Sequence, residues 1–179
     1  MLLYREELES PLGLIDIITD GRTVRAVDFR SHELRMIELM RRYLGPVELR
    51  PATTTSDATS RLIDYFAGDV AAVEALKVTM TGTAFQQRVW AALLTIPSGI
   101  TRTYQQIAEQ IGSRKACRAV GLANGANPIA IVVPCHRVIG ANQTLTGYGG
   151  GLERKRWLLQ HEGVTLATSI SRRAALQVA

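Results

Sequence analysis

Cys135 and His136 are adjacent residues whose side chains could carry out chemistry together. They follow the apolar run 129–133 and a single proline, Pro134. An imidazole next to a thiol can take or share its proton, and the thiolate is the nucleophilic form of cysteine, whose unperturbed pKa is about 8.5. Cys135 is therefore a candidate nucleophile. Without further context, a small buried cysteine beside a hydrogen-bonded core histidine explains the pair equally well.

The apolar run 129–133 predicts the element that positions this pair. Its β-branched side chains suit a buried strand, and Pro134 ends that strand because proline has no N–H to donate to a ladder. Cys135 is then expected to lie just past the end of a core strand.

The chain after residue 82 predicts several short helices with clear ends. The first begins at Thr83 as N-cap and ends at 96–99, where proline and glycine occur. A second helix is predicted over 103–112 and a third over 116–124, joined by the turn 113–115 with its two basic residues. Helix, tight turn and short second helix are typical of a helix-turn-helix.

The predicted helix 116–124 has an unusual composition for an element that reads DNA bases. Arg118 and Asn124 are its only long or polar side chains, whereas positions such as Gly121 and Ala123 are small. Small side chains let a helix backbone approach DNA closely, where Arg118 could act as a wedge between bases. Close packing of a buried helix would explain the same small residues.

Charge is distributed unevenly along the chain. Residues 1–82 carry 10 Lys and Arg against 13 Asp and Glu, whereas residues 83–179 carry 11 against 3. A strongly basic half commonly meets a polyanion, and nucleic acid is the usual one. A solvated basic surface without a partner is the alternative.

Residues 1–82 predict a small sheet-plus-helix domain of α+β type. Hairpin-connected strands are expected first, followed by two capped helices and a polar loop between them. The expected strands cover 2–4, 12–18 and 24–29, the helices run from Ser31 to about 43 and from Ser56 or Asp57 to 66, and the loop covers 50–57. Nothing in this half suggests catalysis.

Composition indicates an ordinary globular protein, 46% hydrophobic over 179 residues. The N-terminus does not resemble a signal peptide and no apolar run could span a bilayer, so we expect a cytoplasmic protein with no membrane partner. Two cysteines do not suggest a disulfide framework. No cofactor or metal is expected, because the other candidate ligands, His32, Cys117 and His161, lack metal-binding spacing.

The sequence resembles the O6-alkylguanine-DNA alkyltransferases, also called methylated-DNA–protein-cysteine methyltransferases, and in particular the bacterial Ogt type. The resemblance covers about residues 83–166 and rests on four ordered motifs. They are Thr103-Tyr104-Gln105-Gln106-Ile107-Ala108, Arg118-Ala119-Val120-Gly121 with 123–128, Pro134-Cys135-His136-Arg137-Val138-Ile139-Gly140, and 147–152 with 157–163. It implies a mostly helical DNA-binding and alkyl-transfer domain at 83–166. Residues 167–179 match nothing and are predicted to be a disordered tail.

The resemblance implies DNA repair by direct, irreversible alkyl transfer from O6-alkylguanine, and also from O4-alkylthymine, to Cys135. The target base is flipped out of double-stranded DNA through minor-groove binding. Arg118 would fill the vacated stack and Tyr104 would help to rotate the base, with further DNA contacts along the helix at Gly121, Ala123 and Asn124. The protein is expected to be a monomer in solution, with cooperative binding on DNA left open.

Further roles follow from the same resemblance. His136, through a bridging water, and Glu162 would activate Cys135, while Asn127 would brace the turn that holds the site. Glu162 is expected at a helix end before a glycine, where a carboxylate is locally unfavourable.

The substrate pocket would be formed by Tyr104, by the backbone carbonyls of Cys135 and Val138, and by the amides of Tyr148 and Gly149. Arg137 is expected to tether the two domains. Ala130 and Gly149 are smaller than their counterparts in some relatives and predict a wider pocket.

Two other function classes are consistent with parts of the sequence. A non-catalytic DNA-binding module would need only the helix-turn-helix and the basic face. A cysteine hydrolase would use the same nucleophile, but it needs an oxyanion hole for which the sequence offers no separate signal.

Overall fold

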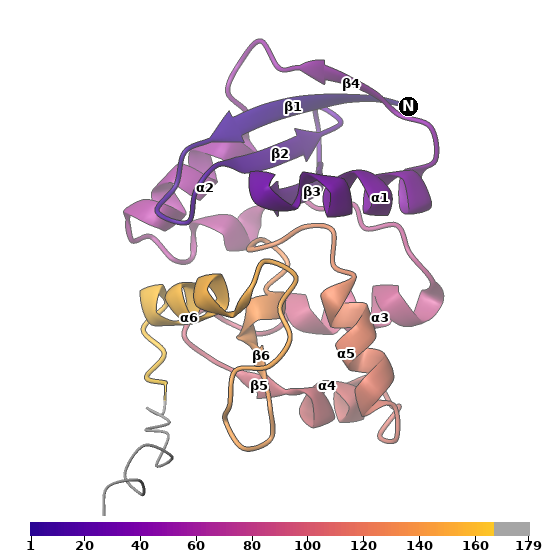
Figure 1. Cartoon of the computed structure of the whole chain (residues 1–179), viewed down its shortest axis with the longest axis vertical. Helices are drawn as coiled ribbons and strands as arrows, with labels where there is room; N and C mark the ends of the chain where they lie inside the picture. The colour runs from indigo at the N-terminus through magenta and orange to yellow at the C-terminus, as the bar shows by residue number, and fades with distance from the viewer. Residues whose placement is uncertain (167–179) are drawn as a thin grey trace, which may run out of the picture.

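The computed structural model describes residues 1–166, in which a four-stranded sheet with its helices is stacked on a mostly helical part (Figure 1). This arrangement confirms the predicted α+β fold class. The tail prediction concerns residues 167–179 and lies outside the described residues. No helix within 1–166 is long and apolar enough to cross a membrane.

The sheet has the strand order β3-β2-β1-β4, with antiparallel neighbours except for the parallel pair β1 and β4. Its central strand β2 is buried along its whole length because both of its faces are covered. The elements are β1 (Leu2–Leu8), β2 (Ile15–Thr19), β3 (Val24–Phe29), α1 (Glu33–Leu44), β4 (Glu48–Pro51) and α2 (Asp57–Ala67), with short 3₁₀ turns at Arg30–His32 and Ala72–Ala75.

Three local expectations for this half were wrong. β1 continues to Leu8 because it pairs with β2 on one side and β4 on the other. β4 lies partly in the predicted polar loop. This strand is mostly exposed and has no alternating apolar pattern, and its pairing with the distant β1 could not be recognised from the sequence. Ser31 does not cap α1, since a 3₁₀ turn precedes the helix, whereas Ser56 caps α2 by accepting a hydrogen bond from the Thr59 amide.

The second part is built from four helices and a two-stranded parallel pair. Thr83 and Thr103 each form a capping box with a glutamine three residues later, which explains why both helix starts could be predicted. The elements are α3 (Ala84–Leu94), β5 (Arg102–Thr103), α4 (Tyr104–Gln110), α5 (Cys117–Gly125), the 3₁₀ helix η3 (Cys135–Arg137), β6 (Val138–Ile139) and α6 (Leu152–His161).

The predicted strand at 129–133 was wrong. Only Ile129 makes a bridge, to Val27 of β3, and the chain then turns, with Ile131 at a φ of 69°. All five residues are buried, as their apolar character requires. The run is apolar because both halves of the molecule pack around a turn, so composition alone could not distinguish it from a strand.

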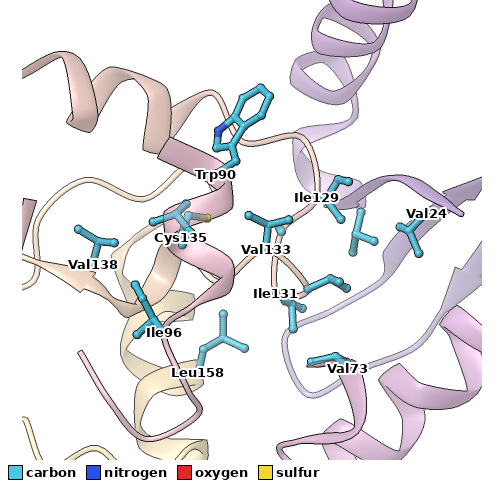
Figure 2. Close-up of a cluster of buried hydrophobic side chains, with 14 of the residues drawn as sticks. Val24, Val73, Trp90, Ile96, Ile129, Ile131, Val133, Cys135, Val138 and Leu158 are labelled. Atoms are coloured by element: carbon cyan, nitrogen blue, oxygen red, sulfur yellow. The ribbon is translucent and has the colours of Figure 1, made fainter. Parts of the chain in front are cut away.

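One cluster of buried side chains extends through both halves of the molecule. Figure 2 shows the Cys135 side chain in this cluster with Val133 and Trp90 from the second half, and with Val24 and Val73 from the first. Because this cluster has members from both halves, the thiol belongs to a core that both halves build. The domain boundary at 82/83 stays a prediction.

Candidate active site

Cys135 is the first residue of η3 and is only 5% exposed. Its sulfur accepts a hydrogen bond from Asn127 Nδ2 at 3.1 Å. Burial raises the pKa of the thiol, against the weaker opposing effect of Asn127. The expectation that a neighbouring imidazole increases the resting thiolate is therefore corrected: the thiol stays protonated at neutral pH and must lose its proton as it reacts.

The Nε2 edge of the His136 ring faces Glu162. Its Nε2 lies 2.8 Å from Glu162 Oε1, and both side chains are fully buried. Burial lowers the pKa of His136, so the ring is neutral at pH 7. A neutral ring that donates from Nε2 to a carboxylate leaves Nδ1 as an acceptor, and Nδ1 is buried with no hydrogen-bond partner among residues 1–166.

Arg137 neutralises the Glu162 carboxylate. Its Nε donates to Oε2 at 2.8 Å and its Nη2 donates to Oε1 at 2.9 Å. Burial alone would raise the pKa of Glu162, but the hydrogen bonds from His136 and Arg137 hold it well below its usual range. A second link of Arg137, from Nη1 to Glu74 at 3.7 Å, reaches the first half of the chain. Its main partner is thus Glu162, and the expected tether is a secondary contact.

Glu162 lies at the end of α6, immediately before Gly163, whose φ is 81°. The expected conflict between a carboxylate and the negative end of a helix is present. It is tolerated because the adjacent Arg137 guanidinium supplies a compensating charge.

Two asparagines hold the backbone around the thiol. Asn127 donates from Nδ2 to the Val133 carbonyl at 2.8 Å and accepts from the Ile129 amide at 3.0 Å, which braces the buried turn. Asn124 donates from Nδ2 to the Cys135 carbonyl at 3.2 Å. The bracing geometry expected for Asn127 is therefore present.

Not every small or polar position on α5 faces solvent. Asn124 and Ala123 are each 3% exposed, and the Ala123 carbonyl accepts the indole N–H of Trp90 at 2.8 Å. The prediction that Ala123 and Asn124 contact DNA is therefore corrected, because both side chains are buried in the core of the site. Arg118 is exposed, and Gly121 faces the Tyr104 ring, which an added Cβ would meet at 3.8 Å.

The loop 140–151 lies at the active site, where the Tyr148 ring faces His136, and it is fastened by Tyr104 and Lys155. The Tyr104 hydroxyl donates to the Thr146 and Gly147 carbonyls at 3.2 and 3.3 Å. Lys155 is fully buried, and its Nζ donates to the carbonyls of Thr146 at 2.7 Å and Val138 at 2.5 Å. The Val138 carbonyl, expected to receive guanine, thus already accepts Lys155.

Tyr148 belongs to the same loop. Its ring is edge-on to His136 with centroids 6.5 Å apart, and its hydroxyl is buried without a hydrogen bond among the described residues. Sequence reasoning missed Lys155; a lysine on the apolar face of α6, one turn before Leu158 and Leu159, was the available signal.

The first half contributes Arg35, which sequence reasoning also missed. Arg35 pairs with buried Asp28 and donates from Nη2 to the Gly125 and Asn127 carbonyls at 2.8 and 3.0 Å. It also fills the space beside Gly149, so the small residue there does not widen the pocket as expected. No local pattern marks the role of this arginine, because the Gly125 carbonyl that it contacts lies 90 residues away in the chain.

Comparison with known proteins agrees with this arrangement. A family model described as 6-O-methylguanine DNA methyltransferase, DNA binding domain, matches residues 84–164. The methylated-DNA–protein-cysteine methyltransferase of Salmonella typhimurium is 47% identical over 168 residues, which are 92% of this chain and 98% of that protein.

Solved structures extend the similarity to the fold. Mycobacterium tuberculosis OGT in complex with DNA has a TM-score of 0.74 at 43% identity, covering 90% of this chain and 92% of that one. The O6-methylguanine-DNA methyltransferase of Pyrococcus kodakaraensis has a TM-score of 0.71 at 25% identity, covering 90% and 99%. With nearly half of the residues identical over almost its full length, this chain belongs to the family of methylated-DNA–protein-cysteine methyltransferases.

Proposed function

We propose that this protein repairs double-stranded DNA by transferring the alkyl group of O6-alkylguanine to Cys135. The observation that carries the proposal is the buried array in which Arg137 and Glu162 hold His136, the residue that follows Cys135 in the chain, with Nδ1 left without a hydrogen-bond partner among residues 1–166. The helix pair α4 and α5 would bind the DNA, and α5 contacts the site through Asn124, which donates to the Cys135 carbonyl at 3.2 Å.

The transfer is a single displacement. The thiol proton passes to His136 Nδ1 through a water molecule, and the resulting imidazolium is stabilised by Glu162. The sulfur forms a bond to the alkyl carbon while the bond from that carbon to guanine O6 breaks. The proton then returns to the departing guanine. Because no step in this reaction converts the S-alkylcysteine product back to the free thiolate, each protein molecule reacts once.

The substrate base must leave the DNA stack before this reaction, at a cost of a few kcal/mol. Exposed Arg118 on α5 would occupy the vacated position, and Tyr104, which donates to the loop at the Gly147 carbonyl, would turn the target nucleotide. Small residues such as Gly121 let α5 approach the minor groove. Some of the residues around the thiol must move to admit the base, because Cys135 is only 5% exposed. O4-alkylthymine would be accepted by the same route.

Intact mass measurement tests the proposal. The protein is incubated with a duplex that contains one O6-methylguanine, and one methyl group per chain is expected. Cys135→Ala should gain none while still binding the duplex, and Cys117→Ala should react normally, because Cys117 lies on α5, outside the array of His136, Arg137 and Glu162. Binding without mass gain by the wild type would indicate a non-catalytic DNA-binding module, and methylation at Cys117 would refute the assignment of the nucleophile.

A further inference from the structure

Tyr65 lies on α2, in the half of the chain where the sequence suggested no part in catalysis. Its side chain is fully buried, and its hydroxyl lies 2.9 Å from Glu162 Oε1. Burial raises the pKa of the phenol far above its usual value, whereas Glu162 is ionised. The phenol is therefore the donor and the carboxylate the acceptor.

The oxygen that Tyr65 contacts is the same one that holds the imidazole. Oε1 of Glu162 accepts from His136 Nε2 at 2.8 Å, from Arg137 Nη2 at 2.9 Å and from Tyr65. Oε2 has Arg137 Nε as its hydrogen-bond donor among the described residues. Three donors to Oε1 leave the Glu162 carboxylate little freedom to rotate. Tyr65 therefore helps to fix the orientation of the His136 ring that donates to the same oxygen.

Tyr65 is itself held by the helix that carries Glu162. Its ring is edge-on to His161, with centroids 5.1 Å apart at 65°, and its carbonyl oxygen lies 2.6 Å from His161 Nε2. His161 in turn stacks on Trp157 at 4.7 Å and 18°. The end of α6 therefore holds both partners of this hydrogen bond: His161 holds the donor Tyr65, and the residue after it, Glu162, is the acceptor.

We propose that Tyr65 is a positioning residue for alkyl transfer: its hydroxyl fixes the Glu162 carboxylate, and through it the His136 ring that takes the thiol proton. The proposal rests on the proposed function of Cys135 and His136. It assigns part of the reaction machinery to the N-terminal sheet-and-helix half. A phenol used only for packing could lose its hydroxyl without a change in chemistry.

Tyr65→Phe separates these two roles because the ring and its aromatic contacts remain. We expect the single-turnover rate on free O6-benzylguanine, which needs no DNA, to fall roughly tenfold, equivalent to about 1.4 kcal/mol. The plateau rate falls because the imidazole is no longer held in place, while the rising limb of the rate profile between about pH 5 and 9 should move upward in pH, since Oε1 without its phenol donor raises the pKa of His136. The groups facing His136 are Cys135, Arg137, Tyr148, Lys155 and Glu162, and all are kept.

Tyr43→Phe is the matched control. The Tyr43 hydroxyl also joins the two halves, by accepting from Gln86 Nε2 at 2.8 Å, and its ring is edge-on to Trp90 at 5.7 Å. It makes no contact with Glu162. We expect its rate and pH profile to match those of the wild type, while urea unfolding shows that both variants are folded.

A double-mutant cycle shows whether Tyr65 acts through Glu162. In a Glu162→Gln background, Tyr65→Phe should produce almost no further loss of rate. Independent losses that multiply, or a Tyr65→Phe profile that overlays the wild type, would overturn the inference. A wild-type protein that transfers no benzyl group would instead refute the proposed function, so the two failures are distinguishable.

Discussion

The guanidinium group of Arg35 occupies the space in which a side chain at residue 149 would begin. A Cβ built on Gly149 would meet Arg35 Cζ and Nη2 at 2.9 Å, closer than real Cβ contacts. Arg35 belongs to α1 and Gly149 to the loop 140–151, so the two halves meet at this point. The shape of the loop therefore depends on an arginine from the first half.

Gly149→Ser should displace Arg35 from its carbonyl partners and lower the free energy of unfolding by about 1–2 kcal/mol, the range for disturbed buried hydrogen bonds. Arg35→Ala should cost more, because it also leaves the buried Asp28 carboxylate without its arginine partner. The two effects should not add, because both remove the same contacts. Urea unfolding of the four proteins measures this coupling, and additive losses would show that residue 149 and Arg35 are independent.

Arg118→Ala should slow repair in duplex DNA at least tenfold and leave transfer from free O6-benzylguanine nearly unchanged. Only the duplex reaction must stabilise an empty position in the base stack, which costs a few kcal/mol. Arg118 is exposed and forms no hydrogen bond or ion pair within residues 1–166, so its loss should not disturb the fold. The ratio of the two single-turnover rates is the measurement. Equal losses of rate with both substrates would show that Arg118 shapes the substrate pocket instead.

Local signals explain which parts of the fold could be predicted. The starts of α2, α3 and α4 were predicted because Ser56, Thr83 and Thr103 bond to amides three residues away. The turn at 129–133 was mistaken for a strand because apolar composition reports burial and not backbone direction. β5 and β6 are two residues each, too short to leave a pattern.

The candidate site divides in the same way. Cys135 and His136 stand out because they are adjacent, and the resemblance to a family supplied Glu162. Tyr65 left no such signal, because its partner is 97 residues away. The place of Lys155 on the apolar face of α6 signals burial, but no sequence pattern marks the backbone carbonyls to which it donates. Long-range contacts of this kind appear only when the chain is folded.

Lys155 should make stability rise with pH in the alkaline range. Burial lowers its pKa to about 8 in the folded protein, whereas an unfolded lysine has a pKa of about 10.4. Between these values the unfolded chain binds more protons, so increasing pH favours the folded state. Relative to Lys155→Met, the wild type should gain roughly 2 kcal/mol in free energy of unfolding from pH 8 to pH 10. If the free energy of unfolding changed with pH in the same way for both proteins, burial would not lower the pKa of Lys155.

Glu162→Gln should destabilise the protein by about 3 kcal/mol at pH 7, because Arg137 would keep a buried charge without its partner. The folded-state pKa of Glu162 is lowered below the unfolded value of about 4.3, so its contribution is complete above that value and is lost as the pH falls. The stability difference between wild type and variant should therefore narrow below about pH 5. Urea unfolding from pH 7 down to pH 4 measures it, and a constant difference would contradict an ionised Glu162.

The same substitution should change how transfer depends on pH. With Glu162 present, the neutral His136 ring accepts the thiol proton and the carboxylate stabilises the imidazolium, so transfer should be fast near neutral pH. Glu162→Gln removes that stabilisation and should slow transfer most near pH 7. Because burial raises the thiol pKa, recovery through unaided thiolate should begin only above the ordinary cysteine value of about 8.5. Single-turnover rates on free O6-benzylguanine from about pH 6 to 10 span this range. A variant profile that overlays the wild type would remove Glu162 from the reaction and leave His136 to act alone.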